Sequence, residues 1–200
     1  DIGATYITDD GKTRLYIKIA ANGRMTVHLY FSQTVTNGVT IDWGDGSATQ
    51  TLTGTGNKNT THTYASIGDY VITLNVTSGT LGLGNGSSSY SVLGSTNNNG
   101  KVYCNMLQKA EIGSSDTSIG NSAFNGCYSL SSINIPEGVT SIGNNAFNEC
   151  YSLSLINIPE AVTNISGYAF SSCYSLSLIN IPEAVTNISS YAFNSCYSLS

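Results

Sequence analysis

A 23-residue sequence repeat in the second half of the chain constrains the fold more than any other feature. Three copies follow one another at 118–140, 141–163 and 164–186, and a fourth begins at Asn187 and stops at Ser200. One cysteine occupies the same place in every copy, so the period can be read directly from the cysteine spacing. Self-similarity of this length is typical of a solenoid, in which each copy forms one coil that packs against its neighbours.

Within each copy, apolar residues recur in the order C-x-x-L-x-x-I-x-I-P-x-x-V-x-x-I-x-x-x-A-F. This spacing predicts an inward apolar set and one short parallel strand per coil, such as 132–135, which Pro136 ends because proline lacks a backbone donor. Residues 104–117 align loosely with the repeat through Cys104 and are predicted to form a degenerate first coil, with 80–84 as a strand ahead of it. The fourth copy stops before its strand, so we expect the natural protein to continue.

The repeat resembles the BspA-like leucine-rich repeat of bacterial surface proteins. The likeness is close over 118–200 and loose over 104–117. It implies a leucine-rich-repeat solenoid with a parallel sheet, and a bacterial protein that is secreted or held at the cell surface. Adhesion to a host or matrix protein is the function that this resemblance implies.

The first half of the chain has a different pattern. Residues 14–20, 25–31, 39–43 and 69–76 alternate apolar and polar side chains, with turns rich in Gly, Asn and Ser between them. Such alternation predicts antiparallel strands with one buried face. Asn22-Gly23 between the first two segments is a hairpin signal.

Two segments in this half, VTIDWGDGS (39–47) and THTYASIGDYVITLNV (61–76), resemble the PKD domain, an immunoglobulin-like sandwich. The matching residues are Trp43, Gly44, Asp45, Gly46 and Ser47, then His62, Tyr64, Gly68 and Tyr70. Asp45 is expected to bond backbone N–H groups of its turn, and Trp43 to fill the core. A calcium role for Asp42 and Asp45 stays open, since carboxylates suit that ion, but turn stabilisation is the favoured interpretation.

The predicted fold is therefore an N-terminal all-β immunoglobulin-like sandwich plus a C-terminal leucine-rich-repeat solenoid with a parallel sheet. We divide the chain into a PKD-like sandwich (1–79), a linker with a degenerate capping coil (80–117), and BspA-like repeats (118–200). The repeated cysteines are predicted to be five buried thiols, because equivalent side chains in a stack point side by side.

Composition excludes several classes of function. Charged residues make up 10% of the chain, against about 25% in typical domains. Seven Lys+Arg and a net charge of −5 argue against a nucleic-acid binder. No apolar stretch reaches the roughly 18 residues of a membrane span.

The sequence offers no catalytic constellation. His62 belongs to the PKD-like motif and His28 lies on the polar side of a strand, so neither is expected to act as a catalytic base. We therefore expect no enzyme activity, no catalytic residue, no bound cofactor and no metal.

What remains is the surface of the stacked copies, and an extracellular protein or glycan is the expected partner. The candidate contact residues are strand positions and one tyrosine row: Ser132, Asn134, Leu155, Asn157, Leu178, Asn180, Tyr128, Tyr151 and Tyr174. Recent duplication of the repeat explains the same rows without any recognition role. Two other functions stay open, namely a carbohydrate-binding accessory protein and a purely structural surface stalk.

Overall fold

The computed structural model describes residues 10–20, 25–34, 37–84, 91–94 and 104–200. Every regular element named in these ranges is a β-strand. The predicted Asn22-Gly23 turn lies outside them. In chain order the strands are β1 (Thr13–Ile19), β2 (Thr26–Gln33), β3 (Val39–Asp42), β4 (Gln50–Leu52), β5 (Gly56–Thr63), β6 (Gly68–Val76), β7 (Leu81–Leu83), β8 (Leu107–Glu111), β9 (Asp116–Ile119), β10 (Ser132–Asn134), β11 (Leu155–Asn157), β12 (Asn164–Ile165), β13 (Leu178–Asn180) and β14 (Asn187–Ile188).

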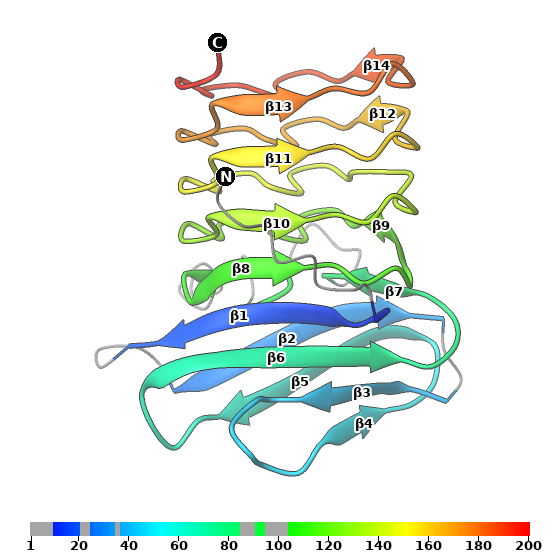
Figure 1. The fold of residues 1–200 in the computed structure, drawn as a ribbon, viewed down its shortest axis with the longest axis vertical. Helices are drawn as coiled ribbons and strands as arrows, with labels where there is room; N and C mark the ends of the chain where they lie inside the picture. Colours follow the sequence, from blue (N-terminus) through cyan, green and yellow to red (C-terminus); the bar gives the residue numbers. More distant parts are fainter. Residues whose placement is uncertain (1–9, 21–24, 35–36, 85–90, 95–103) are drawn as a thin grey trace.

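The N-terminal strands form two layers at one end of the molecule, with β1 and β6 in front of β2 and β5 (Figure 1). The four strands predicted from alternation are present as β1, β2, β3 and β6, and 80–84 contains β7 as expected. Their apolar faces turn inward: Ile17 on β1 and Leu29 on β2 are both buried in one core. Alternation with a period of two places one face of each strand in that core.

Strand β5 was not predicted from the sequence, because its residues GNKNTTHT have no apolar alternation. It pairs with β2 along its whole length, from Gly56 opposite Gln33 to Thr63 opposite Thr26. The strand forms because its backbone covers the edge of β2, a tertiary effect that overrides weak local propensity.

The predicted parallel sheet of the repeats is present only in part. The strands of the later coils form two two-stranded parallel sheets, β11-β13 and β12-β14, while the other coil strands join mixed sheets. One sheet has the order β10-β8-β1-β6-β3-β4 and a second has the order β5-β2-β7-β9, so both sheets mix N-terminal strands with strands of the coils. Parallel pairing does occur between β8 and β10, β11 and β13, and β12 and β14. The mixture arises because β1 runs antiparallel along β8 and covers the edge of the first coil.

Above these layers the coils stack along the long axis of the molecule (Figure 1). Phe124, Phe147 and Phe170 lie one above another, with ring centroids 5.2 and 5.3 Å apart. Backbone bonds join each coil to the next, as when Phe124 N–H donates to the Ala146 carbonyl at 2.7 Å. One continuous core runs from β1 through the coils.

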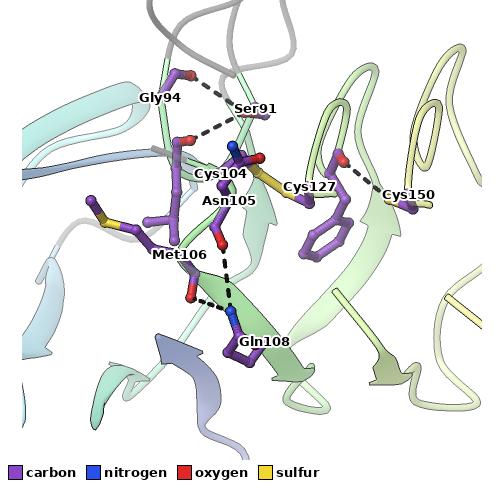
Figure 2. Close-up of a disulfide and its surroundings, with 10 residues drawn as sticks. Ser91, Gly94, Cys104, Asn105, Met106, Gln108, Cys127 and Cys150 are labelled. Carbon is purple, nitrogen blue, oxygen red and sulfur yellow. Dashed lines mark hydrogen bonds between the residues drawn. A yellow bond between two sulfur atoms is a disulfide. The ribbon is translucent and has the colours of Figure 1, made fainter. Parts of the chain in front are cut away.

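The expectation of five thiols is wrong at the base of the stack. Cys104 and Cys127 form a disulfide, with their Cα atoms 4.6 Å apart (Figure 2). Adjacent coils bring equivalent positions within the Cα separation that a disulfide needs, and at this pair the sulfur atoms bond although equivalent side chains were expected to point side by side.

Higher in the stack, Cys150, Cys173 and Cys196 are free thiols. The Cys150 thiol donates to the Phe124 carbonyl at 3.2 Å, and Cys173 bonds the Phe147 carbonyl in the same way. Burial raises the pKa of Cys173 to about 12, with a smaller contribution from the neighbouring Cys196. These thiols are therefore protonated donors inside the coils.

Candidate functional site

The outer faces of the coil strands form an open groove with a volume of about 650 Å³. We call it the strand groove. Asn134, one of the predicted contact residues, is exposed on β10 but does not line it. The other five predicted strand residues do line it: Ser132, Leu155, Asn157, Leu178 and Asn180.

The groove follows from the two-residue period of each strand. The central isoleucine, such as Ile156 in β11, points into the core, so the residues on either side of it face outward. Parallel pairing then places Leu155 beside Leu178 and Asn157 beside Asn180. Equivalent side chains therefore stand in rows along the stack.

The lining combines apolar and amide groups. Leu155 and Leu178 are 56% and 62% exposed, although Leu is a residue that folding normally buries. Asn157 and Asn180 each offer a carbonyl acceptor and an NH₂ donor. None of the lining residues carries a charge. The groove can thus supply apolar contact and neutral hydrogen bonds.

The predicted tyrosines do not join this groove. Tyr128, Tyr151 and Tyr174 form a separate stacked column, with ring centroids 4.6 and 4.7 Å apart. The Tyr128 hydroxyl donates to Glu149 Oε2 at 3.0 Å. The nine predicted contact residues therefore fall into two surfaces, and five of the strand residues line the strand groove.

The WGDGS turn is held together by its own side chains. Asp42 Oδ1 accepts the Gly44 N–H at 2.9 Å, and Asp45 Oδ2 lies 2.7 Å from His62 Nε2. Hydrogen bonding from Ser47 and then from His62 lowers the pKa of Asp45 to about 2.

Packing also fixes this turn. The His62 ring stacks on Trp43 at 4.8 Å, and the buried Tyr64 hydroxyl donates to the Trp43 carbonyl at 2.9 Å. Within the described ranges, no group of three or more His, Cys, Asp or Glu residues could hold a metal ion. The contacts support turn stabilisation as the role of Asp42 and Asp45.

A family model described as a BspA type leucine rich repeat region matches residues 98–200 in six copies. The chain belongs to this BspA-type leucine-rich-repeat family. The match begins ahead of Cys104 and so includes residues 104–117. No curated protein matches the chain.

Three solved structures resemble this BspA-type protein. A leucine rich cell surface protein from Faecalibacterium prausnitzii A2-165 is 28% identical over 63% of this chain and 35% of its own, with a TM-score of 0.50. A leucine-rich repeat protein from Bacteroides ovatus ATCC 8483 is 35% identical over 48% of this chain and 25% of its own, with a TM-score of 0.46. The T. pallidum leucine rich repeat protein is 29% identical over 60% of both chains, with a TM-score of 0.49.

This chain therefore spans between 25% and 60% of the length of these three relatives. No helix with the length and hydrophobicity for a membrane crossing occurs in the part of the chain that the structure describes.

A second groove on the BspA-type repeats, with a volume of about 530 Å³, was not predicted from the sequence. We call it the coil-edge groove, and its lining includes Asn121, Asn144, Asn145, Gly167 and Tyr168. It shares no lining residue with the strand groove. The sequence does differ between copies at this place, although most other positions are the same. Residues 120–122, 143–145, 166–168 and 189–191 read Gly-Asn-Ser, Gly-Asn-Asn, Ser-Gly-Tyr and Ser-Ser-Tyr.

Proposed function

We propose that this protein is a non-catalytic binding protein of the bacterial cell surface or exterior, and that its strand groove binds a partner protein. The observation that carries the proposal is the pair of rows in the groove, where exposed Leu155 and Leu178 adjoin Asn157 and Asn180. Membership of the BspA-type family and the name of the F. prausnitzii cell surface protein support the location.

The groove suits a protein partner for a physical reason. Burial of one leucine side chain contributes about 1.5–3 kcal/mol, and the amides can bond backbone groups of the partner. Equivalent contacts recur with every coil, so one partner engages several weak sites at once, and affinity rises through effective concentration. Adhesion to a host or matrix protein is the use that we assign to such a surface.

For the N-terminal layers we propose a PKD-like, immunoglobulin-like sandwich over 1–79 that serves as a spacer or second adhesion module. The joined contacts of Trp43, Asp45, His62 and Tyr64 support this assignment. Residues 80–117 then act as linker and capping coil, and 118–200 as the binding repeats. A chain without 1–79 would leave β8 without its partner β1, so the proposal is best tested in the whole chain.

The test measures binding of the whole chain to a panel of immobilised extracellular matrix proteins. In a double variant, Leu155→Ser with Leu178→Ser, we expect affinity to fall at least about tenfold, since two leucines that the partner would bury are lost. Asn157→Ala with Asn180→Ala should also weaken binding, by a smaller factor.

The matched control is Ile67→Ser, which removes an equally exposed apolar residue, 59% exposed, from the N-terminal layers. We expect this variant to bind as the parent does. If Ile67→Ser lowers affinity and the leucine variant does not, the coils act as a stalk. Loss only in Tyr151→Ser with Tyr174→Ser would instead assign binding to the tyrosine column.

A further inference from the structure

The coil-edge groove offers a column of amide donors. Asn121 Oδ1 accepts the N–H of Asn144 at 2.9 Å, and Asn144 Oδ1 accepts the N–H of Gly167 at 3.0 Å. Each bond fixes the oxygen end of the amide against the next coil. The NH₂ end therefore remains as the hydrogen-bond donor that the groove presents.

Beside these amides stand two exposed aromatic rings. Tyr168 and Tyr191 are 43% and 61% exposed, and their rings stack with centroids 5.0 Å apart. Tyr191 covers one face of Tyr168, so the other face is turned toward the preceding coil. The equivalent residue in that coil is Asn145, whose side chain is far smaller than a ring. A space next to the free face of Tyr168 is left where a third ring would otherwise stack.

Gly167 keeps this space open. A Cβ atom on Gly167 would lie 3.3 Å from Asn144 Oδ1, so a side chain at this position would occupy part of the space beside the amide column. The two preceding coils carry asparagine at this position. The hollow therefore arises from two changes between copies, a side chain lost at one position and a ring gained at the next.

The lining of the groove carries no charged side chain, and this indicates which class of ligand it can bind. Its lining contains only Asn, Gly, Ser and Tyr residues, and the whole chain has a net charge of −5. An anionic ligand would meet no cation there, and a cationic one no carboxylate. The lining matches a neutral ligand that has many hydroxyl groups and one weakly polar flat face.

We propose that the coil-edge groove binds a sugar ring of a neutral saccharide. The ring packs its C–H face on the free face of Tyr168, because the centre of an aromatic face is electron-rich and attracts the weakly positive C–H hydrogens. Its hydroxyl oxygens accept bonds from the Asn144 amide, and Asn145 can donate to or accept from a further hydroxyl. This site is separate from the strand groove and does not depend on the proposed protein partner.

The test screens the whole chain against an array of neutral glycans that includes glucan, mannan, xylan and chitin oligomers. It then titrates the best hexasaccharide by calorimetry. We expect a dissociation constant on the order of 1 mM or tighter. Tyr168→Ala removes the ring face and should weaken binding at least about tenfold.

A second variant fills the space instead of removing the ring. Asn145→Tyr should extend the stack, because Tyr168 adopts nearly the same backbone conformation as Asn145, with φ of 56° and 55°. This variant should also lose binding at least about tenfold while its melting temperature is retained, which separates occlusion from unfolding. Tyr174→Ala lies outside the groove and should bind as the parent does.

Four results would overturn the proposal. They are no binding to any neutral glycan of the array, a preference for sulfated or sialylated glycans, equal binding by the Asn145→Tyr variant, and equal loss of binding in the Tyr174→Ala control.

Discussion

The N-terminal layers and the stacked coils make their turns by different means. In the described residues up to 94, every residue with positive φ is a glycine. In the coils, seven other residues adopt that conformation: Ser122, Asn145, Glu149, Tyr168, Ser172, Tyr191 and Ser195. An L-residue there costs roughly 1–2 kcal/mol, so the coils must hold these turns by other contacts.

Those contacts come from the next coil. Asn145 N–H donates to the Gly167 carbonyl at 3.0 Å, and Glu149 N–H donates to the Ser171 carbonyl at 2.8 Å. The N-terminal turns are thus set by local residue choice, and the coil turns by stacking. Because stacking holds the coil turns, different side chains can occupy the same turn position. Asn145 and Tyr168 are such a pair, and both line the coil-edge groove.

The largest expected effect comes from removing one buried ring in each region. Phe31→Ala and Phe147→Ala both empty fully buried sites, and each should lower the free energy of unfolding by about 3–5 kcal/mol. Because a coil packs mainly on its neighbours, Phe147→Ala should speed hydrogen exchange in the coils and leave β3 and β6 protected. Phe31→Ala should speed exchange in both N-terminal sheets. Equal loss of protection in β3 and β6 for both variants would mean that the regions unfold as one unit.

A pH effect is expected at Asp116, where the two regions meet. Its buried carboxylate accepts a 2.7 Å bond from the Thr13 hydroxyl of β1. Desolvation raises its pKa from 3.8 to about 7, and the Thr13 bond opposes this only in part.

The folded state therefore favours the protonated acid. The stabilisation is complete below the unfolded pKa near 4 and is lost as pH rises through about 7, by up to roughly 4 kcal/mol. Urea unfolding across this range should show the decline in the parent and a flatter profile in Asp116→Asn. An unchanged slope in the variant would contradict the assignment.

How much of this could be read from the sequence also differs between the regions. The strong alternation of 14–20 predicted β1 within a residue, and the fixed spacing of Ile156 and Ile179 predicted the strands of the groove. The register between coils followed from the repeat itself. These predictions were possible because the spacing of apolar residues indicates which side chains face the core.

Other features depended on contacts that no local pattern encodes. The strand β5 is polar and forms on the edge of β2, and the pairing of β1 with β8 joins segments far apart in the chain. The repeat register places Gly167 and Tyr168 next to Asn144 and Asn145, but it does not show that these side chains leave a groove between the coils. Differences between copies were visible, but their consequence in space was not.

A smaller effect is expected from the disulfide, which ties only the base of the stack. Thiol titration in denaturant without reductant should count three thiols per chain, those of Cys150, Cys173 and Cys196. Reduction of the Cys104–Cys127 disulfide should lower the free energy of unfolding by about 3 kcal/mol, as expected for a closed loop of this length. A count of five thiols would contradict the disulfide and show that Cys104 and Cys127 are free thiols like the other three cysteines.

The smallest expected effect tests the turn comparison itself. Ser172 has φ of 60°, and the equivalent residue in an earlier coil is Gly126, with φ of 72°. Relief of backbone strain should exceed the entropic cost of glycine, so Ser172→Gly should raise stability by less than about 1 kcal/mol. Ser154→Gly, at a position without positive φ, should lower stability by a similar amount. Destabilisation by both would show that stacking leaves no strain at residue 172.

The central claim is that the coils bind and the N-terminal layers support them. Hydrogen–deuterium exchange of the whole chain, alone and with the matrix protein that it retains most tightly, tests this claim directly. We predict slower exchange in β10, β11 and β13 on binding, with β3, β4 and the WGDGS turn unchanged. Protection confined to β3, β4 and that turn would contradict the claim and assign binding to the N-terminal layers.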